Sequence, residues 1–225
     1  MNKTVKIILG FFITVFVMML SGAFEFGILS LFKFIPIGLA SQLLILIISS
    51  GLIYFFNKNG IIDFNIKKVT IKQIIQSILV TFLVLLVAQF VFYYSIGNTN
   101  EEHIVTSLSG VSMVFMLLLA SISEELLFRG FLQNMLDPLK SYGLKIMNLK
   151  LSLPVILSGI LFGLIHFGIM STGVSFNFAL TIVLPAVIVG ILAGFFQEKY
   201  NNFSLAIIVH ITANITGFIS SIITT

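Results

Sequence analysis

The 225-residue chain has no cysteine, and this absence excludes several kinds of chemistry. Without thiols the protein can form no disulfide, offer no thiolate nucleophile and hold no metal through sulfur. Charged residues are also scarce: they make up 9% of the chain, against about 25% of an average soluble domain. The lysines form no long basic run, so the net charge of +4 does not indicate a nucleic-acid partner.

Apolar residues, in contrast, are abundant along the whole chain. They account for 58% of it, which is more than a soluble fold could bury. A transmembrane helix needs about 20 apolar residues, and stretches of this kind recur from end to end. We therefore expect an all-α polytopic membrane protein with about seven transmembrane helices, near residues 7–31, 34–56, 71–97, 107–136, 153–170, 177–197 and 203–223.

The lysines set the expected orientation of these helices. Cytoplasmic loops are rich in Lys and Arg. With seven helices, every lysine except Lys33 falls on the same side of the membrane as the N-terminus, and Lys33 falls on the other side with Glu101 and Glu102. The N-terminus is therefore expected in the cytoplasm and the C-terminus outside. The apolar run after Lys6 is too long for a signal peptide and lacks an Ala-x-Ala site, so we expect a retained first helix. Abundant Ile, Lys, Asn and Phe favour the plasma membrane of a bacterium with an AT-rich genome.

Three ionisable residues interrupt the apolar pattern of the fourth predicted helix. Glu124, Glu125 and Arg129 follow an uncharged run over residues 104–123. A charge near the bilayer centre costs about 2.5–3.5 kcal/mol or more, so this cluster indicates a functional site. Glu125 and Arg129 are four residues apart and can pair on one helix face. Glu124 points about 100° away, and we expect it to face a cavity.

Two histidines lie in later predicted helices. His166 falls within the fifth, and His210 precedes Asn214 by four residues, so an imidazole and an amide share one face of the seventh. At about 1.5 Å of rise per residue, these depths allow one hydrated cavity shared with Glu124 in the inner half of the membrane. Each residue also has a purely structural interpretation, in which an ion pair or a hydrogen-bonded imidazole bridges helices.

Other small and polar residues favour packing over chemistry. Gly159-x-x-x-Gly163 permits close approach of two helices. Gln42 is a single polar group in an apolar helix and is expected to bridge to a neighbour. Glu25 is expected at the membrane interface near Lys33, and no lysine lies in the middle of a predicted helix, where it could activate a catalytic serine.

The ordered set Glu124-Glu125-x-x-x-Arg129, Phe162-x-x-x-His166 and His210-x-x-x-Asn214 resembles the CPBP intramembrane proteases. This family, also called Abi, includes CAAX prenyl proteases and bacteriocin-processing or bacteriocin-immunity proteins. The resemblance covers about half of one integral membrane domain: residues 107–223 would form the catalytic core, and the helices in residues 1–106 carry no motif.

The resemblance implies peptide-bond hydrolysis in a conical cavity within the membrane. Carried over by position, Glu124 and His166 would activate the attacking water, while His210 and Asn214 would stabilise the oxyanion. Glu125 and Arg129 would order the site, or Arg129 would meet a substrate carboxylate. The partners implied are a peptide substrate and the lipid bilayer, and the oligomeric state is left open.

Dependence on a metal also stays open. Glu124, His166 and His210 could hold zinc with one position free for water, and the family is often described as metalloproteases. The His-Glu-x-x-His arrangement of many zinc proteases is absent, and the resemblance also allows a metal-free mechanism that depends on glutamate.

Three functions are compatible with the sequence. The first is an intramembrane endopeptidase for a short or membrane-associated peptide, acting in bacteriocin or pheromone processing or in self-immunity. The second is a non-catalytic immunity or scaffold protein that binds a peptide or a sensor kinase. A transporter ranks third, because no inverted repeat is visible.

Overall fold

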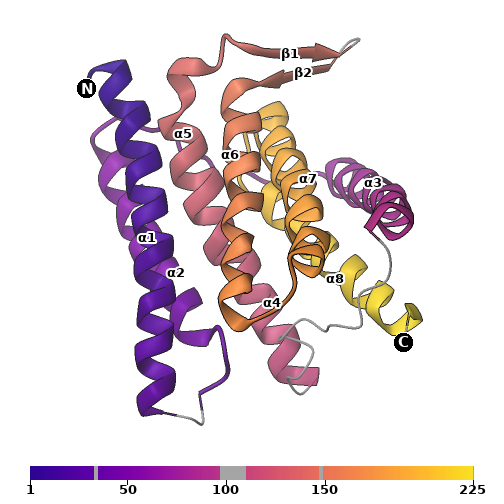
Figure 1. Ribbon diagram of the computed structural model, residues 1–225. Helices are drawn as coiled ribbons and strands as arrows, with labels where there is room; N and C mark the ends of the chain where they lie inside the picture. Colours follow the sequence, from indigo (N-terminus) through magenta and orange to yellow (C-terminus); the bar gives the residue numbers. More distant parts are fainter. Residues whose placement is uncertain (33–34, 97–109, 147–148, 225) are drawn as a thin grey trace. The chain divides into compact units, whose positions relative to one another are not determined.

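The computed structural model describes residues 1–32, 35–96, 110–146 and 149–224. Helices dominate, with one short two-stranded hairpin, so the all-α polytopic class expected from the sequence is confirmed. The chain divides into two compact units, each assembled from separate stretches of sequence, whose positions relative to one another are not determined (Figure 1). Each unit is described by itself.

Unit 1 comprises residues 1–64 and 102–141. Its first two elements are long helices that follow one another in the chain. A third helix comes later and changes from α-helical to π-helical winding partway along. The elements are α1 (Lys3–Leu31), α2 (Leu39–Lys58), α4 (Gly110–Glu125), a π-helical segment η2 (Leu126–Leu132), α5 (Gln133–Met135) and a 3-10 turn η3 (Asp137–Leu139).

Unit 2 comprises residues 65–101 and 142–225. It contains one helix from the first half of the chain and all the elements that follow residue 142. They are α3 (Ile71–Ile96), strands β1 (Gly143–Ile146) and β2 (Leu149–Ser152), α6 (Leu153–Leu164), a 3-10 segment η4 (Ile165–Thr172), α7 (Phe176–Tyr200) and α8 (Ser204–Thr224).

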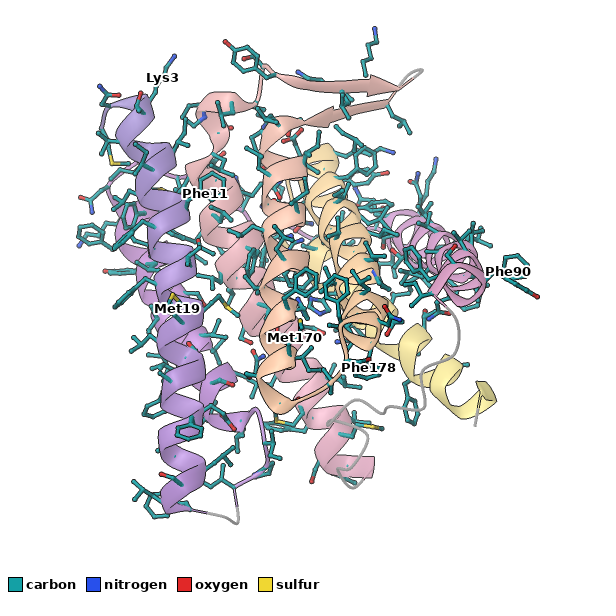
Figure 2. All side chains as sticks on the ribbon, in the orientation of Figure 1. Lys3, Phe11, Met19, Phe90, Met170 and Phe178 are labelled. Atoms are coloured by element: carbon teal, nitrogen blue, oxygen red, sulfur yellow. The ribbon has the colours of Figure 1, made fainter. Side chains whose placement is uncertain are left out.

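Six helical stretches among the described residues are long and apolar enough to cross a membrane. They are α1, α2, α3, α7 and the combined stretches Gly110–Met135 and Leu153–Thr172; the apolar stretch Ser204–Ile219 of α8 is shorter. Large apolar side chains are exposed on them, such as Met19 (71%) on α1 and Phe90 (65%) on α3 (Figure 2). Such exposure suits a lipid environment, and the chain is a multi-pass membrane protein.

Some expectations fall on residues that the structure does not describe. Lys33, Glu101 and Glu102, on which the orientation partly depends, lie outside the described residues, as does the division expected between residues 106 and 107. The cytoplasmic N-terminus and the two-part organisation therefore stay predictions.

Glycine allows close packing within unit 1. A Cβ atom on Gly10 of α1 would lie 2.6 Å from the Cβ of Met135 in α5, so a side chain at this position would collide. A Cβ on Gly130 would lie 2.5 Å from Cδ1 of Ile53 in α2. Both contacts bring α1 and α2 against the chain that follows Glu125, where most side chains are buried.

In unit 2, glycines also allow α6 to pack closely against α7. A Cβ on Gly159 would lie 2.7 Å from the backbone nitrogen of Ile191, and one on Gly163 would lie 2.8 Å from that of Val187. These are backbone atoms that cannot rotate away, so the expected close approach at Gly159-x-x-x-Gly163 is confirmed. Helix α6 is thereby fixed against α7 just before the chain reaches His166.

Polar contacts fix the start of α3 to the turn between α7 and α8. The side-chain amide of Asn202 donates to the Lys67 carbonyl (3.0 Å) and accepts from the Lys67 N–H (3.2 Å). The Phe203 N–H donates to the carbonyl of Asn65 (2.9 Å). An apolar core shared by α3, α7 and α8 contains Leu85, Val189, Ala193, Phe196, Leu205, Ala206 and Val209.

The hairpin before α6 was not expected from the sequence. Its strands pair antiparallel, with Leu144 opposite Leu151 and Lys145 opposite Lys150. Leucine and lysine alternate along both strands, and this period of two is the signal that would have predicted it.

Candidate active site

A buried ion pair lies at the centre of the charged cluster in unit 1. The Nε atom of Arg129 is 3.2 Å from Oε2 of Glu125, and its Nη1 donates to Oε1 at 3.3 Å. Both side chains have no exposed surface. The expected pairing is confirmed, and its two-point geometry suits a guanidinium facing a carboxylate.

The helix changes its winding at this pair. Helix α4 ends at Glu125, and the π-helical segment η2 carries Arg129. The Asn134 side chain donates to the carbonyls of Arg129 (3.0 Å) and Gly130 (2.9 Å), which satisfies backbone acceptors at this wider turn. The Arg129 guanidinium also lies 5.7 Å from the centre of the Phe128 ring. Short π-helical stretches occur frequently at functional sites.

Glu124 belongs to a different set of contacts, as its direction on the helix predicted. It is nearly buried, with 9% of its surface exposed. The side-chain amide of Gln42 in α2 donates to its Oε1 atom (2.7 Å). The Ser123 hydroxyl in turn donates to Oε1 of Gln42. Gln42 therefore bridges α2 and α4, as expected for a lone polar residue in an apolar helix.

In unit 2, His166 lies just beyond the end of α6. It sits in the 3-10 segment η4, whereas the sequence pattern predicted a continuous helix. Its Nδ1 atom is 2.7 Å from the carbonyl oxygen of Phe162. A carbonyl oxygen can only accept, so Nδ1 carries the hydrogen, and in the neutral imidazole Nε2 keeps its lone pair.

The Phe162 ring contacts both histidines of unit 2. It meets His166 edge-on with ring centres 5.0 Å apart, and His210 edge-on at 5.4 Å. Phe162 is 1% exposed and His210 6%. The structure thus brings together two imidazoles that are 44 positions apart by number, with Asn214 one turn beyond His210 on α8. Phe162 belongs to the motif Phe162-x-x-x-His166, but the sequence did not indicate this contact with both histidines.

The predicted site residues therefore form two groups, each ordered inside its own unit. One holds Glu124, Glu125 and Arg129, and the other holds His166, His210 and Asn214. Within either unit, the described residues include no group of three His, Cys, Asp or Glu side chains that could hold a metal ion. A shared cavity and a zinc site formed by Glu124, His166 and His210 stay predictions.

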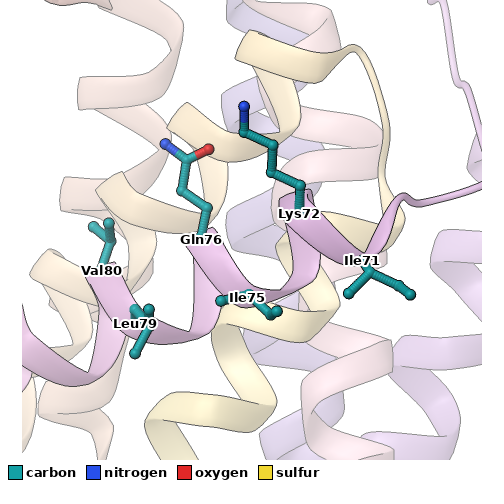
Figure 3. Close-up of a pocket in the computed structure, with 6 residues that line it drawn as sticks. All are labelled: Ile71, Lys72, Ile75, Gln76, Leu79 and Val80. Atoms are coloured by element: carbon teal, nitrogen blue, oxygen red, sulfur yellow. The ribbon is translucent and has the colours of Figure 1, made fainter.

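A shallow groove of about 630 Å³ lies along the N-terminal part of α3. Apolar side chains line it together with Lys72 and Gln76 (Figure 3). None of the predicted site residues contributes to it. In a membrane-spanning helix such a surface suits lipid contact, and it carries no catalytic group.

Comparison with known proteins identifies the region that carries the motifs. Residues 106–216 match the model of a family described as "Type II CAAX prenyl endopeptidase Rce1-like". A search of curated proteins and a search of solved structures each found no match. The matched residues include all six predicted site residues, so the resemblance stated from the motifs is confirmed.

Proposed function

Since the chain belongs, over residues 106–216, to the Rce1-like type II CAAX prenyl endopeptidases, it is a CAAX-type intramembrane protease, and we propose that Glu124 and His166 activate the water it uses. The substrate would be a short or membrane-associated peptide. The observation that carries this proposal is the hydrogen bond from His166 Nδ1 to the Phe162 carbonyl, because it leaves Nε2 as a proton acceptor.

The reaction uses one water molecule. As its oxygen bonds to the carbonyl carbon of the scissile peptide, a proton passes to Glu124 or to Nε2 of His166. The carbonyl oxygen becomes an oxyanion in a tetrahedral intermediate. The carbon–nitrogen bond then breaks and the proton moves from the base to the departing amine. The products are a free amine and a carboxylic acid, which ionises by releasing the second proton of the water.

His210 and Asn214 would stabilise the oxyanion. Both side chains can donate, and their four-residue spacing on α8 directs them to the same face. Removal of one such donor typically lowers turnover by about 10²–10³-fold. Glu125 and Arg129 would hold the helix that presents Glu124, since their ion pair is fully buried.

Hydrolysis by purified protein in liposomes tests the proposal. Two quenched fluorescent probes define the substrate class: a peptide ending in a farnesylated Cys-a-a-X sequence, and a non-prenylated hydrophobic leader peptide. Glu124→Gln and His166→Ala should each lower turnover by about 10²–10⁴-fold, as expected when a general base is lost. Exposed Lys145 on the hairpin provides the control, and Lys145→Ala should cleave at the normal rate.

The outcomes separate the alternatives. Full turnover in Glu124→Gln that is correctly folded would remove the proposed base. Peptide binding without cleavage by the unchanged protein would favour the non-catalytic immunity or scaffold role. Metal analysis of the purified protein, with and without chelator, decides whether the glutamate-dependent or the zinc mechanism applies. We propose the plasma membrane of a bacterium as the location, with bacteriocin or pheromone processing or self-immunity as the role.

A further inference from the structure

Gln42 lies outside the region that carries the family pattern, yet it contacts the proposed base. It belongs to α2, whereas the family match begins at residue 106. Its Nε2 atom donates to Oε1 of Glu124 at 2.7 Å, a short distance for a hydrogen bond from an amide to a carboxylate. Both residues belong to unit 1, so this contact lies inside one compact body.

The orientation of the Gln42 amide is set by the Glu124 carboxylate. An ionised carboxylate can only accept, so the NH₂ end of the amide faces Glu124. The oxygen end then faces Ser123, whose hydroxyl donates to Oε1 of Gln42. Ser123 and Glu124 are neighbours in sequence, so one glutamine side chain hydrogen-bonds to both residues and fixes the Glu124 carboxylate relative to α2.

The part of α2 that holds Gln42 is itself anchored. The Glu25 carboxylate of α1 accepts hydrogen bonds from the backbone N–H groups of Gly38 (2.7 Å) and Ser41 (2.8 Å). These are unpaired donors at the start of a helix, which a carboxylate satisfies well. Ser41 directly precedes Gln42, so the cap that holds the first turn of α2 also holds the Gln42 side-chain amide near Glu124.

We propose that Gln42 is a positioning residue for catalysis: its amide holds one oxygen of the Glu124 carboxylate and thereby aims the proposed base. The inference rests on the proposed function. It goes beyond a helix-bridging role, because a simple bridge would affect folding alone. A positioning role affects the chemical step, since a misdirected base lowers turnover even when the protein is folded.

Variants of Gln42, assayed with the two liposome probes, separate these roles. Gln42→Leu keeps similar bulk but removes the donor, and kcat should fall about 10–100-fold with KM nearly unchanged. Ser123→Ala leaves the donor but removes the second hydrogen bond that holds the Gln42 amide, so kcat should fall less. Gln89→Leu is the matched control: Gln89 is also a glutamine within an apolar helix, α3, and belongs to unit 2, whereas Gln42 and Glu124 belong to unit 1. Its kcat should match that of the unchanged protein.

Gln42→Glu provides a readout that a structural role would not give. When protonated, the new carboxyl can still donate to Glu124; when ionised, it repels it. The variant should therefore keep most of its turnover at acidic pH and lose it as the pH rises, relative to the unchanged protein. This comparison also decides the matter if Gln42→Leu does not fold.

The results distinguish the two levels of inference. No hydrolysis of either probe by the unchanged protein overturns the proposed function, and with it the role of Gln42. Hydrolysis by the unchanged protein, together with normal kcat in folded Gln42→Leu or an unaltered pH profile in Gln42→Glu, overturns the role of Gln42 alone.

Discussion

Phe162 contacts His166 in two ways: its carbonyl oxygen lies 2.7 Å from Nδ1, and its ring meets the imidazole edge-on with centres 5.0 Å apart. The first contact comes from the backbone and survives any substitution. The second depends on the aromatic ring, which also contacts His210. The two contributions can therefore be separated by mutation.

Phe162→Leu should lower turnover more than stability. It retains the backbone acceptor but removes an aromatic contact of about 0.5–1.5 kcal/mol to each imidazole. We expect several-fold lower kcat in liposomes and a modest drop in the unfolding temperature in detergent. Phe196→Leu is a matched control, since Phe196 is equally buried (1%) and stacks on Tyr200 instead. Equal kcat in the two variants would contradict a role for the Phe162 ring.

Removing one member of the buried ion pair should strongly destabilise unit 1. Arg129→Met leaves the Glu125 carboxylate buried without its counter-charge, at about 3–5 kcal/mol. The double variant Glu125→Gln/Arg129→Met should recover much of this loss, because neither charge then remains. Chemical unfolding of the single and double variants in detergent measures the difference. A double variant no more stable than Arg129→Met would argue against the pair as the cause.

Gly163→Ala should disrupt the packing of α6 on α7. Its Cβ would lie 2.8 Å from the backbone nitrogen of Val187 and 2.9 Å from the carbonyl oxygen of Val183. Overpacking of this kind costs about 1–3 kcal/mol, and thermal unfolding should register it. Gly217→Ala is the control, because nothing lies within 4 Å of a Cβ there, and it should not lower the unfolding temperature.

Glu25→Ala should weaken the start of α2. Loss of a helix-capping acceptor costs about 0.5–2 kcal/mol, and hydrogen exchange should speed up at the amides of Gly38 and Ser41, which now lose their acceptor. Glu25→Gln keeps an acceptor oxygen and should retain part of the protection. Unchanged exchange at these two amides in Glu25→Ala would contradict the capping role.

The sequence predicted the helices well because hydrophobic length is a strong signal. Each of the expected apolar stretches contains a helix, with boundaries a few residues from those expected. The Glu125–Arg129 pair followed from a spacing of four, which brings residues together in most helical windings. Gln42 was identified as a bridge, but its partner could not be foreseen, because a contact across 82 positions depends on tertiary packing.

Changes of helix type were beyond the sequence pattern. The sequence predicted one continuous helix over residues 107–136 and another over residues 153–170, so nothing indicated the π-helical segment or the 3-10 segment that carries His166. The contacts of the Phe162 ring were missed because Phe162 lies in an apolar run over residues 159–165 and nothing distinguishes it there from a packing residue. The roles of Glu124, His166, His210 and Asn214 stay predictions.

The backbone contact between α6 and α7 also bears on how a lipid-borne peptide arrives. Where the Cβ of an alanine would already collide at Gly159 and Gly163, no acyl or isoprenoid chain can slide between the two helices. Under the proposed function, a substrate diffusing in the plane of the bilayer would therefore reach His166 from a side other than the contact between α6 and α7.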